Sequence, residues 1–259
     1  MTVTYDPDLY DIAIPQSFGG DVDWYCRKAR EAGGPVLELG AGTGRITIPI
    51  AQAGVPVWAL DADLRMLALL RHKLDALPPE VQQRVTIVKG DMRSFALEPR
   101  FALVISPFRA FLHNLTTEDQ LACLRRVHEH LQPGGRFAFN IFHPSLEYMA
   151  RSAGALAGVW RLISTHQLPD GGVLVRSEVN RYDTVNRRVR SLHRHEHYGP
   201  DGNGVRTFLQ QLELAYLYPA DVRTLLAEAG FSNVKIDGDF NGRPLLNDAD
   251  EQVIEAVRN

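Results

Sequence analysis

Short apolar runs alternate with amphipathic stretches along the first half of the chain. The runs have the composition of buried parallel strands, and they lie at residues 36–39, 55–60, 85–88, 101–105 and 136–141. A helix is expected over residues 43–53. A second helix is expected after Asp63, a typical N-cap residue, because apolar side chains then repeat at helical spacing up to Leu74. This alternation predicts βαβ units and a doubly wound, mostly parallel α/β sheet.

The rhythm changes after Pro144. Four segments with strand character follow, separated by turn-rich sequence, at residues 160–168, 173–183, 188–198 and 205–217. Consecutive strands joined by tight turns form hairpins, so this part predicts an inserted antiparallel β-sheet. A helix at 219–229 and strands at 234–239 and 253–257 then complete the first sheet, which we expect to have seven strands with the last one antiparallel.

The chain therefore divides into three stretches. Residues 1–144 are expected to form the α/β core with an N-terminal arm, and residues 145–218 the inserted sheet. Residues 219–259 return to the core with its last helix and two strands. The inserted sheet is expected to serve as a lid, as the contact surface of a homodimer, or as both.

Composition narrows the class of protein. The chain has 259 residues, of which 45% are hydrophobic and 23% charged, as in an ordinary globular protein. A net charge of −3 argues against a nucleic-acid partner. Cys26 and Cys123 form no C-x-x-C pair, which favours a reducing cytoplasm. We expect no membrane partner, since no apolar run reaches the ~20 residues of a spanning helix and the start of the chain lacks the pattern of a signal peptide.

The first apolar run ends in a glycine-rich turn, which is the clearest indication of ligand binding in the sequence. Gly40, Gly42 and Gly44 follow it as G-x-G-x-G, and Asp61 lies seventeen positions beyond the last glycine. Glycines at the carboxyl end of a strand allow the backbone to approach a ligand closely. An acidic residue at the end of the next strand can accept hydrogen bonds from two ribose hydroxyls. The pattern predicts a nucleoside-containing cofactor.

The spacing decides the kind of cofactor. Dinucleotide binding requires G-x-G-x-x-G, but Arg45 stands where the third glycine would be. The variant that starts at Glu38 resembles the first motif of the class I S-adenosylmethionine-dependent methyltransferases. The resemblance implies that Glu38 and the three glycines hold the methionine end of S-adenosylmethionine and that Asp61 binds the ribose. It further implies adenine contacts from three residues, namely Met66 on the ring face, Asp91 to the exocyclic amine and the Met92 amide to the ring.

Resemblance to one group of these methyltransferases suggests which residues lie near the methyl acceptor. In the amino-sugar N,N-dimethyltransferases of antibiotic biosynthesis, which this chain resembles, a histidine after the fourth strand and an N-terminal tyrosine lie near the acceptor amine. The matching residues are His113 and Tyr10, which this resemblance makes the catalytic candidates. Histidine titrates near pH 6.5 and can take a proton at neutral pH. The implied function is methyl transfer to a small-molecule acceptor, with an amine nitrogen favoured.

Several other residues allow further interpretations. Ser106-Pro107-Phe108 partly resembles the motif of methyltransferases that act on base amino groups, but it lacks the amide or carboxylate acceptor and the second proline. Three alternating histidines share one strand face, but no further ligands accompany them, so no metal site is expected. They are His193, His195 and His197. Arginines at 181, 187, 188, 190 and 194 suit an anionic acceptor or a solvated strand face, and Arg109 and Arg243 are further candidates for an anion.

Three rival functions stay open at this point. They are an O-methyltransferase for a small metabolite, a Rossmann-type oxidoreductase, and a catalytically silent module that binds S-adenosylmethionine and acts through partners. The position of Gly44 and the Gly90-Asp91-Met92 segment argue against the oxidoreductase. A silent module is expected to have lost its glycines or its acidic residue, and this chain keeps both.

Overall fold

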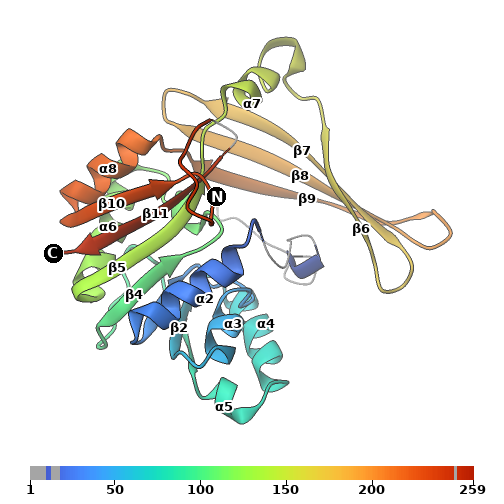
Figure 1. The fold of residues 1–259 in the computed structure, drawn as a ribbon. Coiled ribbons are helices and arrows are strands. Elements are labelled where there is room, and N and C mark those ends of the chain that lie inside the picture. Colours follow the sequence, from blue (N-terminus) through green and yellow to red (C-terminus); the bar gives the residue numbers. More distant parts are fainter. Residues whose placement is uncertain (1–9, 13–17, 248–249) are drawn as a thin grey trace. The chain divides into compact units, whose positions relative to one another are not determined.

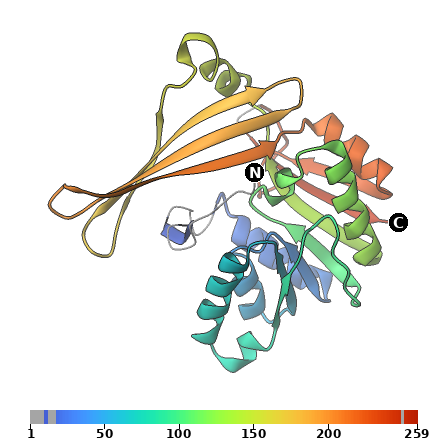
Figure 2. The ribbon, with the colours of Figure 1, turned by 180° about the vertical axis from the view of Figure 1, so that it is seen from behind.

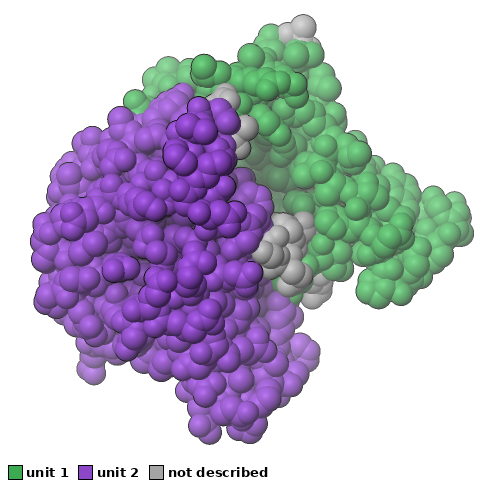
Figure 3. All heavy atoms as spheres, viewed as in Figure 1, with its two compact units in different colours: residues 1–15, 144–216 green, residues 16–143, 217–259 purple. Residues whose placement is uncertain are grey.

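A computed structural model describes residues 10–12, 18–247 and 250–259. The chain separates into two compact units (Figure 3). Unit 1 comprises residues 1–15 and 144–216, and unit 2 comprises residues 16–143 and 217–259.

Unit 2 is built on a seven-stranded sheet with the order β10-β11-β5-β4-β1-β2-β3. In chain order, the strands are β1 (Val36–Leu39), β2 (Val57–Asp61), β3 (Val85–Lys89), β4 (Phe101–Ser106), β5 (Leu131–Phe142), β10 (Phe231–Asp237) and β11 (Glu251–Arg258). The pairs among β1 to β5 are parallel, whereas β11 is antiparallel to both of its neighbours. The predicted mostly parallel sheet with an antiparallel last strand is confirmed.

Helices cover both faces of this sheet (Figures 1 and 2). They are α2 (Asp21–Ala32), α3 (Thr47–Gln52), α4 (Leu64–Asp75), α5 (Pro79–Gln82), the 3-10 helix η1 (Ala110–His113), α6 (Thr117–His130) and α8 (Pro219–Glu228). Helices α2, α3 and α4 share one hydrophobic cluster with alternate residues of the central strands, such as Val36 and Val57. Helices α6 and α8 pack together near β5 and β10. The doubly wound arrangement follows from strands that are apolar on both faces.

The helix after the glycine turn is shorter than predicted. We expected it over residues 43–53, but α3 begins at Thr47. Gly44 has a φ of 87° and its N–H donates to the carbonyl of Ala41 at 3.0 Å, so the glycine turn continues where a helix was expected. Regular helix starts only beyond this turn.

Unit 1 contains the predicted antiparallel sheet, in the order β6-β7-β8-β9. Its elements are α7 (Leu146–Arg151), the 3-10 helix η2 (Gly154–Leu156), β6 (Arg161–Gln167), β7 (Val173–Asp183), β8 (Arg188–Tyr198) and β9 (Gly204–Ala215). All strand pairs in this sheet are antiparallel. The turn-rich segments between the strands form the expected hairpins. In the described part of the chain, no helix is long and apolar enough to cross a membrane.

Candidate active site

The glycine turn lies at the point of the sheet where the order of successive strands reverses. The chain runs from β1 outward through β2 to β3, and then returns to place β4 on the other side of β1. In open α/β sheets, ligands bind beyond the carboxyl ends of the strands at such a point. The turn that follows β1 therefore occupies the ligand-binding edge of unit 2.

The three glycines of this turn are required by its geometry. Gly40, Gly42 and Gly44 have φ values of 74°, 56° and 87°, which side-chain-bearing residues rarely adopt. A Cβ on Gly40 would lie 2.7 Å from the Cβ of Ala110, and one on Gly44 would collide with the Leu70 side chain. Side chains at these positions are therefore disfavoured by the positive φ values and, at Gly40 and Gly44, by neighbouring side chains as well. We call the turn of residues 40–44 the cradle.

Asp61 supports this cradle from the end of β2. Its Oδ2 accepts the N–H of Gly42 at 2.8 Å, and its Oδ1 accepts the N–H of Asp63 at 2.8 Å. Each carboxylate oxygen can accept a further hydrogen bond, so the group suits a pair of vicinal ribose hydroxyls. Burial raises the pKa of Asp61, and the backbone donors oppose this shift.

Glu38 lies within β1, beneath the cradle. Its side chain is buried, and its Oε2 accepts a hydrogen bond from Thr47 Oγ1 at 2.5 Å. Burial raises the pKa of this carboxyl to about 8, while the Thr47 hydroxyl and the nearby Arg45 act in the opposite direction. A cationic ligand group beside this carboxyl would favour its ionised form, because an opposite charge nearby stabilises the carboxylate.

Arg45 stands where a dinucleotide-binding motif would have its third glycine. It has a structural role that the sequence analysis did not predict. Its guanidinium holds the carboxylate of Asp21 through two hydrogen bonds of 3.1 and 2.6 Å. Asp21 is fully buried at the start of α2. The Arg45 guanidinium also lies 4.9 Å from the centre of the Phe108 ring. The glycine turn is thus tied to α2 and to the loop after β4.

Two methionines reach the cradle from either side. Met66, buried on α4, places its Cε 3.5 Å from the position of a Cβ on Gly42. The Cε of Met92, which follows β3, lies 3.9 Å from the corresponding position at Gly40. The side-chain amide of Asn114 donates to the Met92 sulfur at 3.3 Å. The structure therefore brings Met66 and Met92 to the turn, with Asp91 beside Met92.

His113 is the last residue of η1, the same short helix whose first residue, Ala110, contacts Gly40. Burial lowers the pKa of the His113 imidazole to about 4, so the ring is neutral at physiological pH. Tyr10 belongs to unit 1, and its placement beside His113 stays a prediction.

A buried polar network fixes the loop that leads to His113. Asn140 of β5 accepts the Tyr25 hydroxyl and the Phe108 N–H at its Oδ1, both at 2.8 Å, and its Nδ2 donates to Glu251 at 2.7 Å. Arg109 holds the same Glu251 carboxylate through hydrogen bonds of 3.1 and 2.8 Å. Phe108 and Arg109 both have positive φ, at 50° and 68°. The network maintains a strained backbone directly before η1.

Comparison with known proteins identifies the family. Residues 36–135 match the model of a methyltransferase domain. An uncharacterized methyltransferase of Bacillus subtilis, YrrT, is 31% identical over 160 residues, which cover 58% of this chain and 71% of that protein. The chain belongs to the class I S-adenosylmethionine-dependent methyltransferases. The oxidoreductase alternative is therefore excluded.

Other relatives cover nine tenths or more of this methyltransferase. The cypemycin N-terminal methyltransferase of a Streptomyces species is 25% identical and covers 98% of this chain and 99% of its own. The CcbJ methyltransferase of Streptomyces caelestis has a TM-score of 0.78 at 26% identity, covering 98% of this chain and 100% of that one. The glycopeptide N-methyltransferase MtfA, solved with S-adenosylmethionine, has a TM-score of 0.55 at 28% identity and covers 90% and 94%.

Five of the seven arginines that the sequence offered for an anionic acceptor form ion pairs with acidic residues of the methyltransferase. In unit 2, Arg109 binds Glu251, and Arg243 binds Asp250 at 2.6 Å. In unit 1, Glu213 of β9 lies beside two of the insertion arginines, and Glu196 beside a third. The pairs are Arg188–Glu213, Arg190–Glu213 and Arg194–Glu196. These pairs favour the interpretation of the arginines as a solvated strand face.

The insertion histidines alternate along β8 as predicted. His195 is buried and stacks on Phe208 of the neighbouring strand, with ring centres 4.5 Å apart. Burial, together with Arg176 and His195, lowers the pKa of His193 to about 4. Among the described residues, no group of three or more His, Cys, Asp and Glu side chains is placed to hold a metal.

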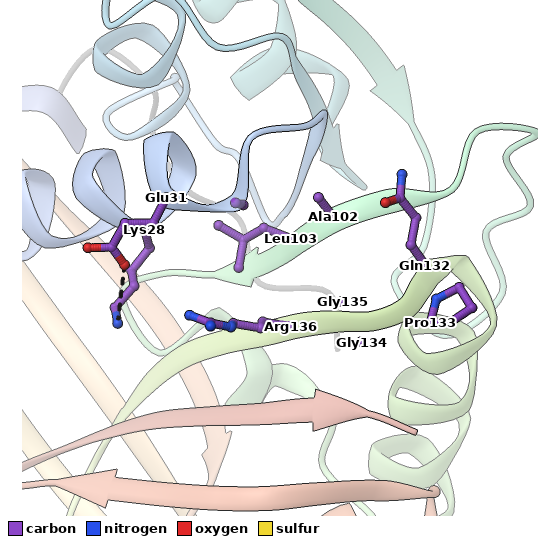
Figure 4. A pocket seen from close by; sticks show the side chains of 10 residues that line it. Lys28, Glu31, Ala102, Leu103, Gln132, Pro133, Gly134, Gly135 and Arg136 are labelled. Carbon is purple, nitrogen blue, oxygen red and sulfur yellow. Dashed lines mark ion pairs between the residues drawn. The ribbon is translucent and has the colours of Figure 1, made fainter.

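A surface pocket of about 220 Å³ lies elsewhere on unit 2 (Figure 4). Ala102 and Leu103 at the start of β4, Arg136 of β5 and Lys28 of α2 are among its lining residues. Ligands of such sheets bind at the carboxyl ends of the strands, whereas this pocket adjoins the start of β4. It is separate from the glycine turn.

Proposed function

We propose that this methyltransferase transfers a methyl group to an amine nitrogen of a small-molecule acceptor. The observation that carries the proposal is the half-buried imidazole of His113, whose pKa is lowered to about 4, on a short helix whose first residue lies against the first glycine of the cofactor turn. The relatives that cover most of the chain include proteins named as N-terminal and glycopeptide N-methyltransferases, which supports nitrogen over oxygen.

The cofactor roles are part of the same proposal. When bound, S-adenosylmethionine supplies an electrophilic methyl group on a sulfonium. Gly40, Gly42 and Gly44 bind its methionine end by close backbone approach, with Glu38 beneath them. Asp61 accepts the ribose hydroxyls, and Met66 packs on the adenine face. The Asp91 carboxylate accepts a hydrogen bond from the exocyclic amine of adenine, and the Met92 amide donates one to the ring.

His113 acts on the acceptor. A neutral imidazole nitrogen accepts a hydrogen bond from the acceptor N–H, which directs the nitrogen lone pair toward the methyl group. The environment that lowers the pKa of His113 also disfavours a protonated amine, so the reactive, neutral amine is favoured there. Tyr10 donates a second orienting hydrogen bond through its hydroxyl. The protein's main contribution is alignment and the exclusion of water.

Product analysis tests this proposal. The protein is incubated with S-adenosylmethionine and a panel of acceptors, namely an amino sugar, a peptide with a free N-terminus, and the same sugar with a hydroxyl in place of its amine. We expect mass spectrometry to place the new methyl group on nitrogen. His113→Ala removes the hydrogen-bond acceptor and should lower kcat by about 10² or more, whereas His72→Ala, at an exposed position on α4, should leave it unchanged. Methylation of the hydroxyl sugar alone, or full turnover by His113→Ala, would refute the proposal.

A further inference from the structure

Asp91 is held in a fixed orientation by a residue two positions along the chain. The backbone N–H of Arg93 donates to Asp91 Oδ1 at 2.8 Å, and its Nε donates to the same oxygen at 2.9 Å. The terminal guanidinium nitrogen donates to the other carboxylate oxygen, Oδ2, at 2.5 Å. A guanidinium that meets a carboxylate through two parallel hydrogen bonds fixes its plane as well as its position. We call this pair the Asp91–Arg93 clamp.

Arg93 of the clamp is also bound to helix α6. A second guanidinium nitrogen of Arg93 donates to Asp119 Oδ1 at 3.0 Å. Asp119 lies in the first turn of α6, where its own N–H donates to the capping hydroxyl of Thr116 at 3.1 Å. Arg93 therefore bridges the end of β3 and the start of α6. The Asp91 carboxylate is oriented relative to both elements.

The charge of the clamp suits one class of ligand group. Hydrogen bonds from the Arg93 side chain lower the pKa of Asp91, although partial burial opposes this shift. An ionised carboxylate is an acceptor only. It attracts an N–H donor and repels a carbonyl oxygen. A carboxyl group that is free to rotate or to take a proton would lose this discrimination.

We propose that Arg93 is a positioning residue that makes the cofactor site selective for a 6-amino purine over a 6-oxo purine. Arg93 does so by presenting the Asp91 carboxylate to the exocyclic group of the base as a fixed hydrogen-bond acceptor. The inference rests on the proposed function, which places adenine beside Asp91. Adenine donates from its 6-amino group and is accepted, whereas hypoxanthine offers a carbonyl oxygen there and leaves the carboxylate facing an acceptor. Sites built around a specific hydrogen bond discriminate strongly against analogues that lack it.

The chain contains a matched control for this clamp. Arg65 holds Asp63 after β2 with the same two-residue spacing, through its N–H at 2.9 Å, its Nε at 3.2 Å and a terminal nitrogen at 2.6 Å. Asp63 caps α4. The two arginines have the same local geometry, but the proposal gives only Arg93 an influence on the base.

Calorimetric titration with two cofactor products tests the proposal without any turnover. S-adenosylhomocysteine and S-inosylhomocysteine differ at position 6 of the purine and in the hydrogen on N1 that accompanies the 6-oxo group, and a variant of Arg93 changes the response to position 6. We expect the full-length protein to prefer the adenosine form by about 100-fold or more. In Arg93→Met, this ratio should fall at least about tenfold, which corresponds to ~1.4 kcal/mol. In Arg65→Met, the ratio should stay within about twofold of the original protein.

The outcomes separate the clamp from the function on which it rests. If the original protein binds both products equally, the placement of adenine beside Asp91 is wrong and the inference is overturned with it. If the ratio collapses in Asp91→Ala but is unchanged in Arg93→Met, the inference about Arg93 alone is overturned. Should Arg93→Met fail to fold, as judged by circular dichroism, Arg93→Lys keeps the charge without the two-pronged geometry. This variant should lose selectivity likewise, and a retained ratio would overturn the clamp.

Discussion

Replacing Glu38 by glutamine should change how the stability of the protein depends on pH. Glu38 is buried in β1, and burial raises its pKa from 4.5 to about 8. Because the folded state holds the proton more tightly than the unfolded state, the stabilising contribution is complete below pH ~4.5 and is lost as the pH rises through ~8. Glutamine has a similar shape and can accept the Thr47 hydroxyl hydrogen bond, but it has no proton to lose.

The size of the change in the free energy of unfolding follows from the pKa shift of Glu38. Each pKa unit corresponds to ~1.36 kcal/mol, so the original protein should lose about 3 kcal/mol through Glu38 between pH 5 and pH 8. Over the same range, His113 has the opposite dependence, since its lowered pKa makes stability rise with pH from about 4 to 6.5. His113 is common to both proteins and cancels in their difference. The free energy of unfolding of Glu38→Gln, minus that of the original, should therefore grow by about 3 kcal/mol.

Urea unfolding at pH 5, 6, 7 and 8, followed by tryptophan fluorescence, to which the buried Trp24 contributes, measures this difference. The difference should increase steadily with pH and level off near pH ~8. Two parallel stability curves, with a difference constant to within about 1 kcal/mol, would show that Glu38 is ionised in the folded protein and would refute the reasoning.

Two further predictions concern the glycine turn and the polar network behind it. Gly40→Ala should destabilise the protein by about 1–3 kcal/mol and abolish binding of S-adenosylhomocysteine in calorimetry, because its Cβ would lie 2.7 Å from that of Ala110 at a φ of 74°. Gly54→Ala, with a φ of 91° but open space around it, should show only the backbone strain and keep binding. Tyr25→Phe should cost about 1–2 kcal/mol in urea unfolding, since it removes a buried hydrogen bond to Asn140. The exposed Tyr148→Phe should cost almost nothing, and equal effects of the two variants would contradict the role of Asn140.

The order of the elements could be predicted from the sequence because it depends on local patterns. Apolar runs such as Val36–Leu39 are buried on both faces, and glycines mark the turns. The start of α3 was predicted wrongly, because residues 43–46 look helical but belong to the glycine turn, in which Gly44 has a positive φ. Local pattern carries no information on where a turn imposed by tertiary contacts will end.

The side-chain pairs that stabilise the site were not predictable in the same way. Arg45 and Asp21 are separated by 24 positions, and Asn140 and Glu251 by 111. Such contacts depend on which strands become neighbours, and the sequence specifies this only through the completed fold. Asn140 nevertheless left a signal, since it is an amide within the otherwise apolar segment Phe137–Ile141. The Asp91–Arg93 clamp spans only two positions, so its residues were visible, but its second partner, Asp119, lies 26 positions beyond Arg93.

The most direct test of the account is the binding of S-adenosylhomocysteine to the original protein, to Asp61→Asn and to Asp63→Asn. The Asp61 carboxylate accepts the N–H of Gly42 in the glycine turn, whereas the Asp63 carboxylate caps the following helix and binds Arg65. Calorimetry should show that Asp61→Asn weakens binding at least about tenfold, or ~1.4 kcal/mol, while Asp63→Asn binds within about twofold of the original. Unchanged binding in Asp61→Asn would show that the cofactor does not use this carboxylate and would contradict the assignment of the site.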